Sequence, residues 1–256
     1  MKGNTGFSSS TARAEELRLR GRESPSWKMH MRSYAFRMTP FIGHARRRRI
    51  LAPFGWGVSV LRPGTAVLEL WQQMAQSMSN ARLELISVSD RFDEYLHILE
   101  NLGDEVDLVC GTYPSGDHSP DFNVLPLGTI PLSFAVPSQD PLARQHAVDA
   151  DELVGKRVRI LKPGNPHLDA ARALLAKRQD IVIVDVDDYE LSTFNDCVEA
   201  GDLLVTTGQW TNIHPGLTCV PATWNLSIPV GIMYPKQPSE VVAQFIELAR
   251  AFLQTS

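Results

Sequence analysis

The stretch from residue 58 to residue 78 constrains the fold most, because its hydrophobic pattern changes period in the middle. Residues 58–61 have the apolar character of a strand end, Arg62, Pro63 and Gly64 form a turn sequence, and helical spacing begins at Thr65. The apolar face of the predicted helix consists of Val67, Leu68, Trp71, Met74, Ala75 and Met78. Strand, turn and helix in this order are the first unit of an α/β domain.

The same alternation continues along the chain and predicts parallel sheets. After the first helix the expected order is strand 83–88, a helix over 92–102 capped by Asp90, and the buried strand 106–111. Residues 122–136 resemble a strand with a break at Gly128, which suggests that the chain leaves one sheet there and enters another. The second series is helix 149–154, strand 157–161, the helix around 168–175, strand 181–186, helix 192–201 and strand 203–206. Periodicity does not decide which sheet receives the last strand, 226–233, and the helix that begins at 238–240.

Charge divides the chain into two parts. Residues 1–50 carry 12 Lys/Arg against 3 Asp/Glu, a balance of +9, whereas residues 51–256 carry 13 against 26, a balance of −13. The head ends in an arginine run at 46–49 and shows no sustained hydrophobic period, so residues 1–52 are predicted to be a basic, disordered segment. That run is either a solvated stretch or a contact for nucleic acid; the acidic body is a poor binder of phosphate backbones.

The cysteines and the hydropathy indicate a reducing, cytoplasmic setting. Cys110, Cys197 and Cys219 are too few and too far apart for a disulfide framework or a zinc site. No apolar run approaches the roughly 18 residues of a membrane span, and the first residues lack the apolar core of a secretory signal. We therefore expect no membrane association.

Motifs of catalysis are scarce, and we predict that the protein is not an enzyme. The sequence has no Gly-x-Ser-x-Gly, no phosphate-binding Gly-x4-Gly-Lys-Ser/Thr and no His-Glu-x2-His. Asp185, Asp187 and Asp188 fit a solvated loop better than a metal cluster, and the seven histidines lack ligand spacing, so neither a metal site nor a cofactor is expected.

Small polar residues, turn glycines and helix starts coincide at strand ends in three places. In open α/β sheets ligands bind beyond the carboxyl ends of the strands, where helix N-termini favour anions. The predicted ligand-binding residues are Ser59, Arg62, Gly64, Thr65, Lys162, Asn165, Ser192, Thr193 and Phe194. Arg62 is either a surface charge or an anion anchor. Ser192 and Thr193 either cap a helix whose Phe194 is in the core or present their hydroxyls to a ligand. Trp71 and Trp210 favour packing over ligand stacking.

From residue 58 to residue 253 the chain resembles the effector-binding domain of LysR-type transcriptional regulators. The resemblance rests on the opening strand with the small polar turn at 59–65, Leu-Gly-x2-Val-Asp-Leu-Val at 102–109, Pro-Leu-Ser-Phe-Ala-Val-Pro at 131–137 with Asp-Pro-Leu-Ala at 140–143, and Asp-Glu-Leu-Val-Gly at 151–155. The resemblance implies two α/β subdomains of the type II periplasmic-binding-protein fold, joined by a hinge of two crossing strands near 128–133 and 222–228. It assigns residues 53–129 and 224–256 to subdomain I and residues 130–223 to subdomain II.

The function implied is a cytoplasmic sensor of a small, anionic metabolite that associates as a homodimer or higher homo-oligomer. Regulators of this family begin with a winged helix-turn-helix, and residues 1–50 lack the two amphipathic helices that it needs. We therefore expect either truncation upstream or a free-standing sensor, with no specific DNA binding by this chain. The alternative from another class is a solute-binding protein of a transport system.

Overall fold

The computed structural model describes residues 53–79, 81–113 and 121–255. The prediction for residues 1–52, including the arginine run, lies outside these described residues. The helices are α3 (Thr65–Met74), α4 (Phe92–Glu100), α5 (Pro166–Leu175), α6 (Leu191–Ala200) and α7 (Glu240–Thr255), with the short 3-10 helices η1 (Pro141–Arg144), η2 (Ala150–Leu153) and η3 (Gly208–Trp210). The strands are β1 (Phe54–Val58), β2 (Leu83–Ser87), β3 (Leu108–Thr112), β4 (Phe122–Pro137), β5 (Arg157–Leu161), β6 (Val182–Val186), β7 (Leu203–Thr207), β8 (Leu217–Pro221) and β9 (Ser227–Pro235).

The strands run in the order β2-β1-β3-β9-β4-β7-β5-β6, with β8 paired to β4 outside this path. We call β1, β2, β3, β9 and the first half of β4, with α3, α4 and α7, the first lobe. The second half of β4 with β5 to β8, α5, α6 and η1 to η3 is the second lobe. Each lobe contains parallel pairs, β1 with β2 and β3 in the first and β5 with β6 and β7 in the second. The parallel pairs place the helices that follow β1, β2, β5 and β6 at the carboxyl ends of their strands.

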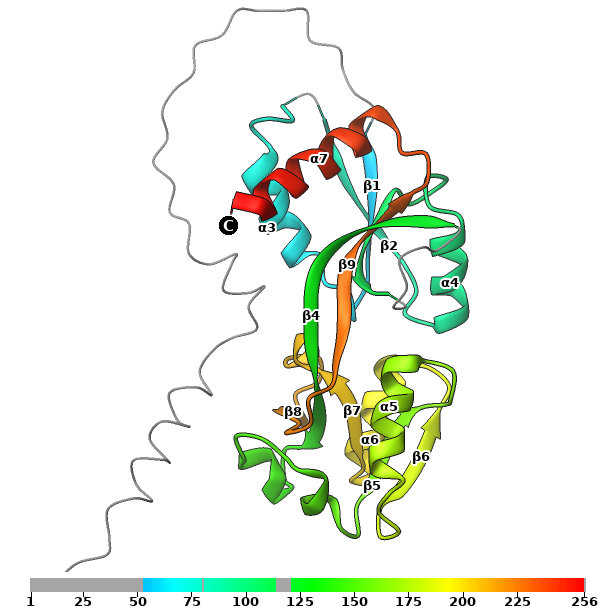
Figure 1. Cartoon of the computed structure of the whole chain (residues 1–256), viewed down its shortest axis with the longest axis vertical. Helices are drawn as coiled ribbons and strands as arrows, with labels where there is room; N and C mark the ends of the chain where they lie inside the picture. Colours follow the sequence, from blue (N-terminus) through cyan, green and yellow to red (C-terminus); the bar gives the residue numbers. More distant parts are fainter. Residues whose placement is uncertain (1–52, 80, 114–120, 256) are drawn as a thin grey trace, which may run out of the picture. The chain divides into compact units, whose positions relative to one another are not determined.

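Strand β4 belongs to both lobes (Figure 1). Residues 122–131 pair with β9, and residues 132–137 pair with β7 and β8. The predicted break at Gly128 is a shift in register between Pro126 and Gly128, where Gly128 has φ +128°, and not an interruption of the strand. A glycine supplies this backbone conformation without steric cost, so the chain crosses between the lobes as one continuous strand.

The first strand lies earlier than the sequence predicts. Strand β1 ends at Val58, and residues 59–62 form a turn in which the Ser59 N–H donates to the Arg62 carbonyl at 3.0 Å. Glycines disfavour a strand, which obscured β1; a Cβ at Gly55 would lie 2.4 Å from the Cδ1 atom of Ile86, whose side chain would have to shift, and 3.1 Å from the Glu105 carbonyl oxygen. The prediction that the strand continues through residue 61 is therefore wrong.

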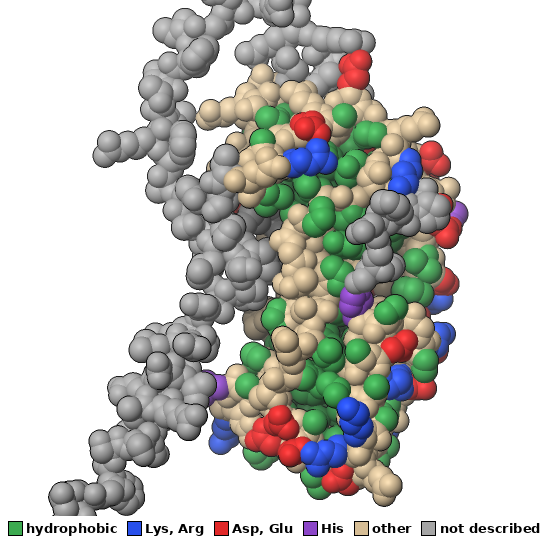
Figure 2. All heavy atoms as spheres, viewed as in Figure 1, with side chains coloured by type: hydrophobic (Ala, Val, Ile, Leu, Met, Phe, Trp, Pro, Cys, Tyr) green, Lys and Arg blue, Asp and Glu red, His purple; other side chains and the backbone are tan. Residues whose placement is uncertain are grey.

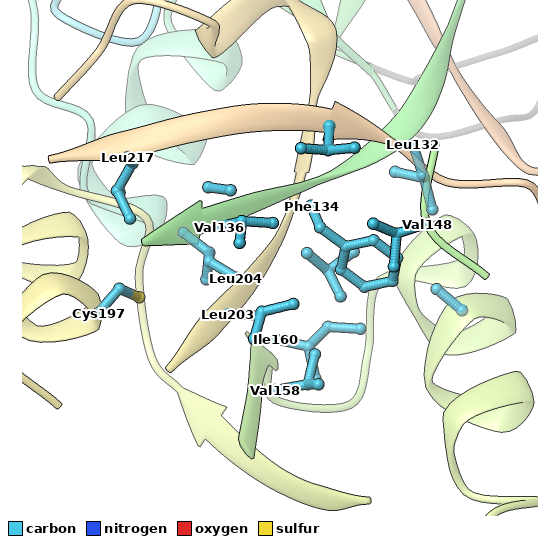
Figure 3. Close-up of a cluster of buried hydrophobic side chains, with 14 of the residues drawn as sticks. Leu132, Phe134, Val136, Val148, Val158, Ile160, Cys197, Leu203, Leu204 and Leu217 are labelled. Carbon is cyan, nitrogen blue, oxygen red and sulfur yellow. The ribbon is translucent and has the colours of Figure 1, made fainter. Parts of the chain in front are cut away.

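Each lobe has its own hydrophobic core. In the first lobe, Phe54 and Trp56 of β1 pack against Phe245 of α7 with ring centroids 5.6 and 5.4 Å apart. In the second lobe, Phe134 of β4 lies among the side chains of β5, β7 and Val148 (Figure 3). Leu61 follows β1 in the first lobe, yet its buried side chain belongs to the second core. The turn after β1 thus contributes a side chain to the second core.

The predicted helices and parallel strands of the second series agree with the structure to within one or two residues. Strand β9 pairs with β3 and β4, and α7 packs in the first core. Strand β8 has no counterpart in the prediction, because its five residues mix Thr, Cys and Pro with two apolar residues. None of the helices in the described part of the chain has the length and apolarity of a membrane span.

Candidate ligand-binding site at the junction of the lobes

The turn after β1 is held by Asp90, which follows β2. The Ser59 hydroxyl donates to Asp90 Oδ1 at 2.5 Å, the Leu61 N–H donates to Oδ2 at 3.2 Å, and Arg62 Nη1 donates to Oδ1 at 2.7 Å. Asp90 therefore binds the turn and does not cap α4, whose N-cap residue is Arg91. One carboxylate ties the ends of the first two parallel strands together.

Arg62 is a largely buried cation. Its side chain is 14% exposed and that of Asp90 is 12% exposed, and the guanidinium carbon lies 3.5 Å from the centroid of the Tyr95 ring. Burial raises the pKa of the Tyr95 hydroxyl, while the charge of Arg62 acts in the opposite direction. Burial also raises the pKa of the nearby Cys110 thiol to about 12, again against the charge of Arg62. Arg62 thus lies inside the lobe and has an acidic partner, unlike a simple surface charge.

Gly64 and Thr65 begin helix α3. Gly64 is the N-cap residue with φ −67°, and no side chain caps the helix there. The first N–H groups of a helix have no partner within it, and the helix dipole adds positive potential. Thr65 is exposed at the first helical position. This helix start therefore presents backbone donors beside a hydroxyl.

The second predicted turn, after β5, is more exposed. Lys162 Nζ lies 3.1 Å from Asp187 Oδ1, and these side chains are 61% and 84% exposed. Gly164 has φ +129°, and the side-chain oxygen of Asn165 accepts from the N–H groups of His167 and Leu168 at 3.1 and 3.3 Å. Asn165 thus caps α5 within its own lobe.

The third predicted segment opens helix α6. The Ser192 hydroxyl donates to Glu190 Oε1 at 2.7 Å, and the buried Thr193 hydroxyl donates to the Asp188 carbonyl at 2.8 Å. Phe194 is fully buried, with its ring centroid 5.9 Å from that of Trp210. Thr193 and Phe194 therefore have structural partners inside the second lobe, and their role in binding a ligand stays a prediction.

Two hydrogen bonds cross between the lobes at these strand ends. Trp210 Nε1 in the second lobe donates to the Leu61 carbonyl at 3.1 Å, and the Phe92 N–H of α4 donates to Asp188 Oδ1 at 2.8 Å. The structure thus joins the turn that contains Ser59 and Arg62 to the region of Thr193 and Phe194. Lys162, Asn165 and Ser192 have their hydrogen-bond partners within the second lobe.

Sequence reasoning missed several residues at the junction. Asp90 was assigned to a helix cap, and Asp188 to a solvated loop. Trp210 was expected to pack, and it does so edge-on against Tyr189 and Phe194, but it also makes a cross-lobe bond. At the end of β7 the hydroxyls of Thr206 and Thr207 are buried without a hydrogen-bond partner. No local sequence signal separates such residues from ordinary strand threonines.

The chemistry available is that of binding. Cations are matched by carboxylates, Arg62 by Asp90 and Lys162 by Asp187, and acidic and basic side chains lie interspersed on the face shown in Figure 2. The aspartates in and after β6 diverge, since Asp185 pairs with Arg172 while Asp188 accepts a hydrogen bond from α4. Among the residues that the structure describes, no group of three or more His, Cys, Asp or Glu side chains is arranged to hold a metal.

The family follows from the match of residues 71–254 to the model described as the LysR substrate binding domain. The chain belongs to this family. It carries the effector-sensing, regulatory domain of a LysR regulator and is not an enzyme. Among curated proteins, no sequence match reaches significance.

Solved structures agree on the type II periplasmic-binding-protein fold of this LysR domain. The effector-binding domain of QuiR in complex with shikimate superposes with a TM-score of 0.59 at 15% identity, over 79% of this chain and 97% of that one. The CcmR regulatory domain of Synechocystis PCC6803 in complex with 2-PG superposes with a TM-score of 0.57 at 14% identity, over 80% of this chain and 98% of that one. Full-length CbnR complexed with its target DNA superposes with a TM-score of 0.57 at 12% identity, over 96% of this chain and 80% of that one. QuiR and CcmR are thus seen with small molecules, and CbnR is seen with DNA.

Proposed function

We propose that the chain senses a small, anionic metabolite at the junction of the lobes and acts by a population shift. The observation that carries this proposal is the pair of cross-lobe hydrogen bonds, from Trp210 to Leu61 and from Phe92 to Asp188, at the carboxyl ends of parallel strands. A ligand that binds there and contacts both lobes has different affinities for closed and open arrangements. It therefore changes their populations.

The anion is proposed because of the start of α3. Its N-cap, Gly64, supplies no side-chain acceptor, so the first N–H groups and the helix dipole remain for a carboxylate or phosphate. Thr65 adds a hydroxyl beside it, whereas the hydroxyl proton of Ser59 is donated to Asp90. Charge-assisted hydrogen bonds of this kind contribute about 1.5–3 kcal/mol each.

A thermal-shift titration with shikimate and 2-PG, followed by calorimetry and a wider set of hydroxy acids and phosphates, tests this function. A true effector at a hundred times its Kd stabilises the fold by about 2.7 kcal/mol, which raises the Tm by roughly 5–10 °C in a domain of this size. Thr65→Ala should weaken binding about tenfold and reduce this shift without changing the Tm of the ligand-free protein. The matched control, Thr218→Ala, removes a hydroxyl from β8, in the second lobe. Equal binding by all three proteins would contradict the assignment.

We also propose that the chain forms a homodimer. The edge strands β2 and β6 lie at opposite ends of the strand order and carry exposed apolar side chains, Leu85 on β2 and Val182 on β6. Leu68 on α3 and Leu191 on α6 are exposed as well. A second copy related by a twofold axis would cover the first lobe's edge with the second lobe's edge. Leu85→Glu should then give monomers in analytical ultracentrifugation, whereas Val154→Glu, at an exposed residue outside both edges, should not.

The proposal includes a cytoplasmic setting, supported by Cys110, Cys197 and Cys219 being thiols. It also includes the division into residues 53–129 with 224–256 and residues 130–223. The pairing of β9 with β3 and β4 supports this division.

This chain by itself is proposed to bind DNA only weakly and without sequence preference, and salt should abolish such binding in a fluorescence-anisotropy titration. Sequence-specific binding that persists in salt would contradict this point.

A further inference from the structure

Helix α4 is capped from the opposite lobe. Its own N-cap residue, Arg91, makes no side-chain cap bond, although short polar caps serve nearby helices such as α5. The Phe92 N–H instead donates to Oδ1 of Asp188, 96 residues further along the chain, at 2.8 Å. A carboxylate at a helix N-terminus is stabilised both by the hydrogen bond and by the dipole.

Asp188 is itself held in place by α6. Its backbone carbonyl accepts the hydrogen bond of the buried Thr193 hydroxyl at 2.8 Å. Asp187 next to it points elsewhere, toward Lys162 of its own lobe. The backbone of Asp188 is thus held in the second lobe, while the N–H group that binds its carboxylate belongs to the first.

The second cross-lobe contact lies at Trp210. The indole N–H donates to the Leu61 carbonyl at 3.1 Å. The indole ring packs edge-on against Tyr189 and Phe194, with ring centroids 5.4 and 5.9 Å apart. On the first lobe, the Leu61 carbonyl that accepts from Trp210 and the Phe92 N–H that donates to Asp188 are linked through Asp90. The carboxylate of Asp90 binds the N–H of Leu61, and Asp90 lies two residues before Phe92. Movement of that unit must affect both contacts.

We propose that Asp188 and Trp210 form a two-point latch, in which Asp188 is the positioning residue that holds α4, and thereby the Leu61 turn, against the second lobe. This inference rests on the proposed function, because the effector acts by changing the population of the latched state. The latch makes one prediction that a local helix cap does not. Removing the carboxylate of Asp188 must change the surroundings of Trp210, although within the described part of the chain these two side chains share no hydrogen bond or ring contact.

The test uses the full chain labelled with 5-fluorotryptophan, with Trp210→Phe to assign the resonance of Trp210 in the fluorine NMR spectrum. In Asp188→Ala the Phe92 amide should exchange about tenfold faster with solvent, and the Trp210 resonance should shift or broaden. Asp187→Ala is the matched control and should change neither. Asp188→Asn keeps an acceptor without the charge and should show a smaller change, and it carries the test if Asp188→Ala fails to fold.

Faster exchange at Phe92 with an unchanged Trp210 resonance would show a merely local cap and overturn the latch. No change at either position would overturn it as well. These failures are distinct from failure of the proposed function. Without effector binding the wild-type chain shows no thermal shift, whatever Asp188 does.

Discussion

Two turns of the chain share one sequence pattern and differ in structure. Arg62-Pro63-Gly64-Thr65 follows β1, and Lys162-Pro163-Gly164-Asn165 follows β5, each with a cation, Pro, Gly and a polar residue before a helix. In the first, the cation is buried against Asp90 and Tyr95, and the glycine is a helix N-cap with negative φ. In the second, the cation is exposed, and the glycine has φ +129°.

The difference shows that the surroundings, and not the motif, decide what such a turn does. Asp90 lies within reach of the first turn, and Leu61 before it is buried in the opposite core. In the second turn Lys162 pairs with Asp187 in solvent, the Gly164 N–H donates to Asp169 of α5, and Asn165 caps the same helix. The first turn is therefore tied to both lobes, and the second serves its own lobe.

The largest expected contrast is between the two cations. Removing one partner of a buried pair costs roughly 3–5 kcal/mol, and Asp90 retains two other donors, so Arg62→Ala should cost about 3 kcal/mol. Lys162→Ala removes an exposed pair and should cost less than about 1 kcal/mol. Urea unfolding of both variants measures the difference. Equal losses would mean that the burial of Arg62 has no energetic consequence.

The next largest contrast in stability is expected between the glycines of the two turns, Gly164 and Gly64. Alanine at position 164 would adopt a backbone conformation that L residues avoid, and we expect Gly164→Ala to cost about 1–3 kcal/mol. The nearest neighbours of an alanine Cβ at position 64 are Leu85 Cδ1 and Val58 Cγ1, each at 3.3 Å, and small side-chain shifts relieve these contacts. Gly64→Ala should therefore cost less than about 1 kcal/mol by thermal unfolding. The reverse order would contradict the assigned backbone conformations.

A smaller contrast separates the two polar residues at the helix starts. Asn165→Ala removes two hydrogen bonds of a cap and should destabilise the protein by about 1 kcal/mol. Thr65→Ala changes an exposed residue and should stay within about 0.5 kcal/mol. Asn165→Asp, which keeps a cap acceptor, is the control and should retain the stability.

The smallest effect concerns pH and the partly buried thiol of Cys110 beside the first turn. Burial raises the pKa of Cys110 to about 12, above the unfolded value of about 8.5, so its contribution is complete below pH 8.5 and is lost as pH rises toward 12. Between pH 7 and pH 9 this contribution to the free energy of unfolding falls by less than about 1 kcal/mol. In Cys110→Ala this fall should be absent when the free energy of urea unfolding is plotted against pH. Lys162→Ala should leave the pH slope unchanged, since its turn contains no such group. An identical slope in Cys110→Ala would show that the thiol is not the cause.

Much of the fold was predictable because hydrophobic period changes visibly at each strand and helix. Helix α3 begins at Thr65 and β5 spans Arg157–Leu161, as the sequence predicts. Errors arose where tertiary packing overrules local preference. Gly55 belongs to a strand because β1 pairs with β2, where Gly55 lies opposite Glu84, and Asp90 binds a turn instead of the helix behind it.

The candidate site was less predictable for the same reason. The segments were chosen at strand ends, and the structure does bring Ser59 and Arg62 close to the second lobe through Leu61 and Trp210. The contacts between segments could not be inferred, because the bond from Phe92 to Asp188 joins residues 96 positions apart and has no local signature. Whether the nine chosen residues bind the effector stays a prediction.

The path of β4 and β9 has a consequence for synthesis on the ribosome. Strand β3 of the first lobe ends at Thr112, and its neighbour β9 begins at Ser227, so translation must pass through the second lobe before β3 gains that partner. At about 5–20 residues per second this interval lasts roughly 6–23 s. During that time the second lobe, whose strands β5 to β8 are contiguous, can fold, while one edge of β3 stays open for pairing with other chains. Nascent chains that stop before β9 should therefore be the form of this protein most prone to aggregation.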